Sequence, residues 1–86
     1  MEQNTNEPTE FQQILQRLGT GNTVVRDTIA LLAERGLKVS RSAMYQALDG
    51  RSNRRELIEA FLETAEAEFE RRRQVRERAA RLIHNA

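Results

Sequence analysis

Cysteine and tryptophan are absent from this 86-residue chain, and proline and histidine each occur only once. Without cysteine the chain can form neither a disulfide framework nor a thiolate metal site, and the lone His84 cannot supply a metal cluster. No apolar run approaches the roughly 18 residues of a membrane span, and the polar N-terminus is unlike a secretory signal. We therefore expect a cytoplasmic protein with no metal, no cofactor and no contact with a membrane.

Aromatic residues are also scarce, and the apolar content of 38% can supply only a modest core. One small domain is expected, with added stability from a partner chain. The sequence shows no Ser/His/Asp set and no phosphate-binding loop. The glutamates of residues 56–70 recur every three or four residues, which indicates a solvated or partner-facing helix face rather than an acid/base pair. We expect neither enzymatic activity nor a small-molecule ligand.

Charge is strongly segregated along the chain, although the net charge is only +1. Residues 35–55 carry six basic side chains against Asp49 alone, and residues 56–70 carry six glutamates and no basic residue. Residues 71–81 carry six arginines against Glu77. A basic block is the expected footprint of a phosphate-binding surface, although arginines on small helical proteins are also often merely solvated.

Helical periodicity and helix-end residues predict an all-α fold, a helix-turn-helix domain of about four helices with a long C-terminal helix. Residues 1–8 lack periodicity and are expected to be a disordered tail, and residues 9–69 to form the DNA-binding domain. Thr9 and Gln12 form a capping-box pattern before a first helix. A second helix is expected to end at Gly36 and to be capped by one of two residues, Asn22 or Thr23. Its buried face is expected to consist of Val25, Ile29, Leu32 and Ala33, widened by Val24, Thr28 and Leu31.

The best-marked element lies between Val39 and Arg55 and is predicted to be the recognition helix. Ser40 is a good N-cap, and Gly50 suits the position just past the helix end. One face is an apolar stripe, formed by Ala43, Met44, Ala47 and Leu48. The opposite face carries the side chains that we expect to contact base edges in a major groove, namely Arg41, Ser42, Tyr45 and Gln46.

The flanks of this helix carry residues that suit the DNA backbone better than bases, because phosphate contacts set affinity rather than sequence choice. The predicted phosphate contacts are Lys38, Ser40, Arg51, Ser52, Arg54 and Arg55. Tyr45 has a second possibility, in which its ring packs on the domain and its hydroxyl reaches a phosphate. Met44 is expected in the core.

A long fourth helix should follow Gly50, capped by Ser52 or by a capping box of Asn53 and Glu56. Residues 70–86 are expected to be a charged helical extension, supported by the ion pairs Glu68–Arg72 and Glu77–Arg81. Its apolar stripe is poorly covered by its own chain, which predicts a homodimer, with an antiparallel pairing of acidic and basic halves as one arrangement. The alternative is a solvated single helix. The predicted dimerisation residues are Phe61, Leu62, Phe69, Val75 and Leu82.

The segment ALLAERGLKVSRSAMYQALDGRSNRRELIEAFLE, residues 30–63, resembles the N-terminal helix-turn-helix of the KfrA-like plasmid DNA-binding proteins. The corresponding stretches are residues 31–36, 40–48 and 49–52, which match the helix end, the recognition helix and the loop. The VSRSAMY stretch and the glutamate-rich helix after it are also similar to the TetR-type pattern, in which the tyrosine equivalent to Tyr45 contacts DNA. Both resemblances imply binding of double-stranded DNA, usually as a dimer on a repeated site.

The sequence therefore predicts a sequence-specific duplex DNA-binding protein, a small dimeric transcriptional repressor of a plasmid, phage or bacterial operon. The alternative is a helical protein-interaction module, an adaptor or inhibitor that holds a protein partner with its charged long helix.

Overall fold

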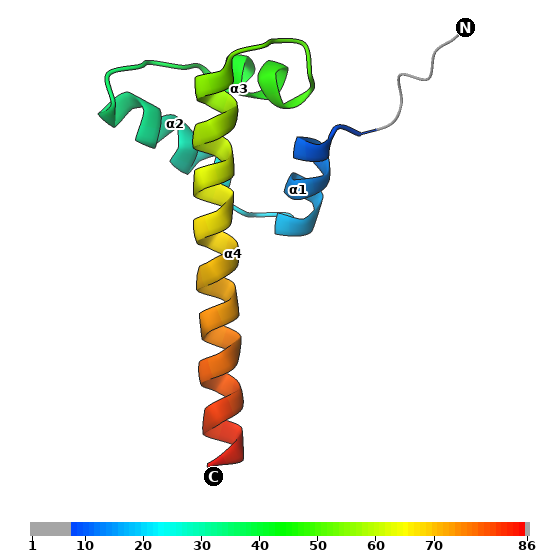
Figure 1. Ribbon diagram of the computed structural model, residues 1–86, viewed down its shortest axis with the longest axis vertical. Coiled ribbons are helices and arrows are strands. Elements are labelled where there is room, and N and C mark those ends of the chain that lie inside the picture. The colour runs from blue at the N-terminus through cyan, green and yellow to red at the C-terminus, as the bar shows by residue number, and fades with distance from the viewer. Residues whose placement is uncertain (1–7, 86) are drawn as a thin grey trace, which may run out of the picture.

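The computed structural model describes residues 8–85, which form four helices joined by short loops (Figure 1). They are α1 (Glu10–Leu18), α2 (Val24–Glu34), α3 (Arg41–Leu48) and α4 (Arg55–His84). No strand occurs in residues 8–85, so the predicted all-α class with a long C-terminal helix is confirmed. The predicted disordered tail lies outside the described residues, except for Pro8.

The first half of α4 is the element on which the other three helices pack, whereas its second half projects away from them (Figure 1). The fully buried side chains come from α2, α3 and α4, and the largest are Phe61, Met44, Leu48, Leu57, Val24 and Thr28. The ring of Phe11 on α1 meets Phe61 edge to face, with centroids 6.5 Å apart. The hydroxyl of Thr28 donates to the Val24 carbonyl oxygen at 2.7 Å, which satisfies the buried polar group.

Helix ends follow the sequence signals at five of the six predicted positions. The Thr9–Gln12 capping box is present, the Ser40 Oγ accepts from the Ala43 amide at 3.0 Å, and Gly50 has a φ of +86°. At α2, Asn22 supplies the cap because its Oδ1 accepts from the Val24 amide at 2.9 Å.

The predicted caps of α4 are wrong. Arg54 occupies the N-cap position and its side chain makes no capping bond, while the Ser52 hydroxyl accepts from the Arg54 amide at 3.4 Å. Asn53 is exposed and lies outside the helix. The expectation for Ala33 is wrong as well, because this residue is exposed at the end of α2.

Contacts between residues distant in sequence fix α1 at both of its ends. The Thr9 hydroxyl donates to the Leu48 carbonyl oxygen at 2.6 Å, and the Gln12 side-chain amide donates to Asp49 at 2.6 Å. At the other end, Arg72 donates from Nη2 to the Leu18 carbonyl oxygen at 2.9 Å. The first helix therefore joins the C-terminal end of α3 to the middle of α4.

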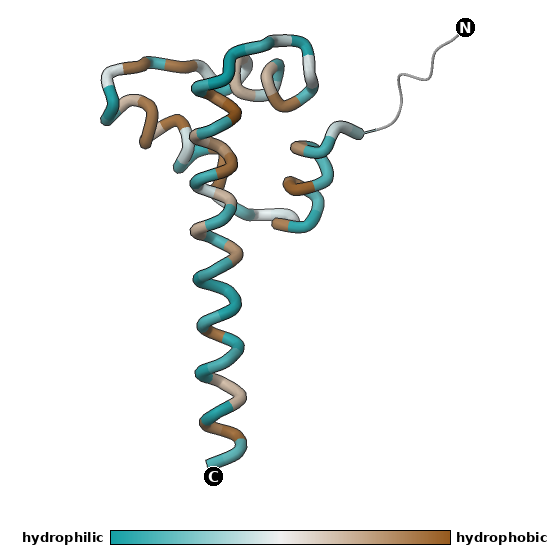
Figure 2. Tube along the Cα trace, viewed as in Figure 1, coloured by the Kyte–Doolittle hydropathy of each residue, from teal (hydrophilic) through white to brown (hydrophobic). Residues whose placement is uncertain are grey.

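Residues 73–85, in the C-terminal half of α4 and at its end, are all exposed. Figure 2 shows that this projecting part of the helix is mostly hydrophilic. The predicted pair of Glu68 and Arg72 is present at 2.7 Å, but Glu77 pairs with Arg73 rather than with Arg81. Arg72, which lies beyond the domain boundary expected after residue 69, still bonds to α1. Within residues 8–85, no helix has the length and hydropathy needed to span a membrane.

The five predicted dimerisation residues differ widely in their exposure. Phe61 is fully buried in the core of its own chain, so its predicted role at a dimer interface is wrong. Leu62 is half-buried and packs against the same core. Phe69 is 36% exposed and lines a hollow beside α1. Only Val75 and Leu82 are widely exposed, at 57% and 73%.

Candidate nucleic-acid interface

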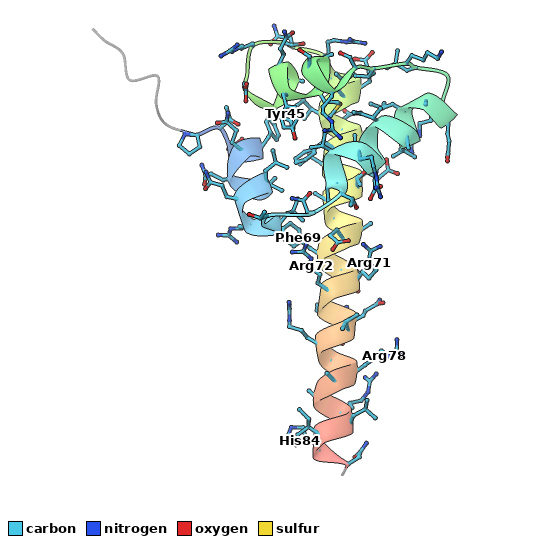
Figure 3. The ribbon with its side chains drawn as sticks, turned by 180° about the vertical axis from the view of Figure 1, so that it is seen from behind. Tyr45, Phe69, Arg71, Arg72, Arg78 and His84 are labelled. Atoms are coloured by element: carbon cyan, nitrogen blue, oxygen red, sulfur yellow. The ribbon has the colours of Figure 1, made fainter. Side chains whose placement is uncertain are left out.

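The outer face of α3 carries all four side chains that the sequence suggests for base contacts. Arg41, Ser42, Tyr45 and Gln46 are exposed, whereas Met44, Ala47 and Leu48 are buried. At 3.6 residues per turn, the four exposed positions fall within an arc of about 140°. Tyr45 is 42% exposed, so its ring is not enclosed by the domain (Figure 3). The helix therefore presents one polar face to a ligand and one apolar face to the core.

The turn before α3 has a fixed geometry that sets the position of this face. Gly36 has a φ of +90°, and the Leu37 amide donates to the Leu32 carbonyl oxygen at 2.9 Å, which ends α2. Leu37 and Val39 then pack against the core on either side of Lys38, which is exposed. The alternation turns the lysine outward beside the start of α3.

The end of α3 is held by α1. The bonds of Thr9 to the Leu48 carbonyl oxygen and of Gln12 to Asp49 satisfy acceptors in the last turn and at the C-cap of α3. Asp49 is the acidic residue among the basic residues 35–55, and the bond from Gln12 occupies one of its carboxylate oxygens. This arrangement was not predicted, since Thr9 and Leu48 are 39 residues apart, and the capping-box pattern indicated only the local partner of Thr9.

Basic side chains surround the exposed face of α3 on both sides. Five of them are exposed and form no ion pair within residues 8–85, namely Lys38, Arg41, Arg51, Arg54 and Arg55. Arg35 differs from these five, because it pairs with Glu63 of α4 at 3.0 Å. The five come from the loops on either side of α3, from α3 itself and from the first residue of α4. We call these residues the basic surround.

Two serines and the start of α4 add polar groups to this region. The Ser40 oxygen accepts a bond from its own helix, so its hydroxyl proton is the group available to an external acceptor. Ser52 is half-buried and accepts from the Arg54 amide. No side chain of residues 8–85 caps the first turn of α4, and its amides therefore add to the positive end of the helix dipole. The region thus carries an excess of positive charge.

The described part of the chain holds no group of three or more histidine, cysteine or acidic side chains placed to bind a metal ion. Comparison with protein-family models, curated proteins and solved structures gives no significant match for this chain. The likeness to KfrA-like and TetR-type proteins therefore stays a prediction that rests on the residues of the motif. The polar face of α3 and the basic surround are the features of the structure that bear on function.

Proposed function

We propose that this protein binds double-stranded DNA in a sequence-specific manner by placing α3 in the major groove. The observation that carries the proposal is the combination of an exposed polar helix face with the basic surround. An α-helix fits the major groove, where arginine and glutamine side chains distinguish base edges. Cationic side chains beside the helix neutralise phosphates and fix its register.

Within this proposal the residues have distinct roles. Arg41, Ser42 and Gln46 read base edges, and Tyr45 contacts either a base or a phosphate through its hydroxyl. Lys38, Arg51, Arg54 and Arg55 contact the backbone, with the Ser40 and Ser52 hydroxyls as further donors. The protein acts as a small dimeric transcriptional repressor of a plasmid, phage or bacterial operon.

The first experiment is selection of duplex DNA from a random library by the full chain, followed by fluorescence anisotropy across a salt series. We expect an enriched motif whose binding by Arg41→Ala is weakened by about 1–3 kcal/mol with relaxed preference at one position. Arg26→Ala is the matched control, because Arg26 is an exposed arginine on α2 outside the basic surround. Failure to enrich any motif, with steeply salt-dependent binding that is indifferent to Arg41, would contradict a sequence-specific role.

A protein-interaction module is the second candidate, and the projecting tail of α4 is the observation that favours it. Removal of residues 75–86 tests the two functions, since this cut leaves Arg72 and the core in place. DNA affinity for a single motif that survives the truncation supports recognition by α3. If the full chain binds no duplex DNA but captures a protein through its tail, the second candidate is correct.

A further inference from the structure

A groove of about 380 Å³ lies between α2 and α4. Ala30, Leu31 and Ala67 give it an apolar lining. Asp27, Glu34 and Glu63 also line it; Asp27 pairs with Arg26 and Glu63 with Arg35, so Glu34 is the lining carboxylate without an ion pair within residues 8–85. It is separate from the polar face of α3, whose residues do not line it. An open apolar groove with acidic side chains suits an amphipathic helix that carries arginines.

The tail of α4 has the complementary properties. Val75 and Leu82 are among the most exposed large apolar side chains of the chain. Arg76, Arg78 and Arg81 are exposed and have no ion pair within residues 8–85, whereas the three preceding arginines pair with glutamates of α4 itself. The tail therefore offers apolar contacts and three arginines without carboxylate partners.

The groove and the tail lie along one stripe of the same helix. Thr64 and Ala67 line the groove, and the same face continues at three- or four-residue spacing through residues 71, 75, 78 and 82. Arg71 and Arg78 lie on the side of α4 that faces α2 (Figure 3). A second copy in antiparallel orientation can therefore meet this stripe with its own stripe, which is the condition for a two-fold symmetric interface.

We propose that the groove between α2 and α4 receives the α4 tail of a second copy of this chain, and that the exchange is reciprocal. Leu82 enters the groove beside Thr64, Arg78 lies opposite Ala67, and Arg81 faces the carboxylates of Glu34 and Glu63. The overlap of residues 64–82 spans about 28 Å of helix. The inference deepens the dimeric part of the proposed function, but it does not depend on DNA binding.

Charge complementarity selects this pairing over the pairing of two tails. Tail against tail would place six arginines and one glutamate of residues 71–81 against the same set. Tail against groove places arginines beside Glu34, which has no ion pair within residues 8–85, and beside Glu63, which pairs with Arg35, and this contact occurs twice in the dimer. Burial in the groove also stabilises a helical end that otherwise has few tertiary contacts.

The absence of cysteine allows a direct test by disulfide cross-linking. We would prepare Ala67→Cys and Arg78→Cys separately in the full chain, mix them without DNA and oxidise the mixture. A covalent heterodimer is expected from the mixture, with little homodimer from either variant alone, because only the 67–78 pair lies within disulfide range. Efficient cross-linking of Arg78→Cys with itself would overturn the proposal in favour of tail-to-tail pairing.

Charge reversal gives an independent test by analytical ultracentrifugation. Arg81→Glu and Glu34→Arg should each raise the dimer Kd by about tenfold, since each contact occurs twice, and the double variant should recover most of the loss. Arg17→Glu on α1 is the control, which should leave the Kd unchanged. A wild-type chain that is monomeric at low salt, or a double variant no better than the singles, would overturn the proposal. DNA binding to a single motif is measured separately, so failure of the two proposals can be distinguished.

Discussion

At the scale of single residues, the side chains of the candidate interface are expected to affect DNA binding in different ways. Both Arg41 and Arg54 belong to the basic surround, but Arg41 lies on the exposed face of α3, whereas Arg54 lies in the loop before α4. A base-contacting arginine affects discrimination between sequences, and a phosphate-contacting arginine affects all sequences equally. The two residues can therefore be distinguished by the pattern of loss rather than by its size.

We predict that Arg54→Ala lowers DNA affinity evenly across sequences and reduces the slope of log K against log salt by about one. The reason is the loss of one phosphate contact and of the counterion released with it. Anisotropy with the selected motif and with scrambled duplexes, at several salt concentrations, measures both quantities. A loss confined to one base position would assign Arg54 to the groove instead.

The Thr9 side chain makes two distinct hydrogen bonds that stabilise the fold. Its hydroxyl accepts from the Gln12 amide at 3.0 Å and donates to the Leu48 carbonyl oxygen at 2.6 Å. Thr9→Val should lower the free energy of unfolding by about 1–2 kcal/mol, because it removes a helix cap and leaves a carbonyl of α3 without its donor. Urea denaturation measures the loss. Thr9→Ser retains the hydroxyl, and an equal loss in that variant would indicate that the methyl group matters instead.

At the scale of elements, α3 was predictable because its signals are local. Ser40, Gly50 and the apolar stripe lie within a dozen residues of each other and give the ends and the buried face. The long-range contacts were not predictable in this way. The bond from Arg72 to the Leu18 carbonyl oxygen joins residues 54 apart, and nothing in the local pattern of either segment indicates it.

The apolar stripe of α4 is also only partly predictable from local sequence. Phe61 and Val75 both belong to its apolar periodicity, but the first is covered by α1, α2 and α3 and the second is not. Periodicity gives the face of a helix and not the extent to which other helices cover it. The predicted pairing of Glu77 with Arg81 is wrong for a similar reason. Arg73 and Arg81 are both four residues from Glu77, and the spacing alone does not select between them.

The tail of α4 should be sensitive to acid. The hydrogen bond from Arg73 holds the pKa of Glu70 below its ordinary value of 4.5, and the same pair raises the pKa of Arg73. A carboxyl whose pKa is lowered in the folded helix adds stability above its ordinary pKa and loses it as the pH falls through the lowered value. We expect the far-ultraviolet circular dichroism of helix to decrease in this acidic range, with a smaller decrease for Glu70→Gln. Identical acid profiles for the two proteins would contradict a contribution of this pair.

At the scale of the whole molecule, α4 places the polar face of α3 and the tail at opposite ends of one helix (Figure 1). In the proposed antiparallel dimer, the two α4 helices would begin about 54 Å apart. Successive major grooves on one side of a duplex are only about 34 Å apart. If α3 is the recognition helix, as proposed, the two copies of α3 in this dimer are therefore better placed to hold two DNA segments than adjacent half-sites.

We predict that the dimer bridges two duplexes that each carry the selected motif. Beads bearing one duplex should retain a second, labelled duplex in the presence of the full chain. Arg81→Glu should bind each duplex singly and retain far less of the second, because the dimer is weakened. Strong retention by a variant shown to be monomeric would contradict the prediction.

The continuity of α4 has a further consequence for the relation between its two ends. Residues 55–84 contain neither glycine nor proline, so the helix has no hinge of the usual kind. Every residue inserted into such a rod rotates one end against the other by about 100°, and seven residues restore the original phase to within about 20°. The angular phase between the two DNA segments held by a dimer would thus be encoded in the number of residues between α3 and the tail.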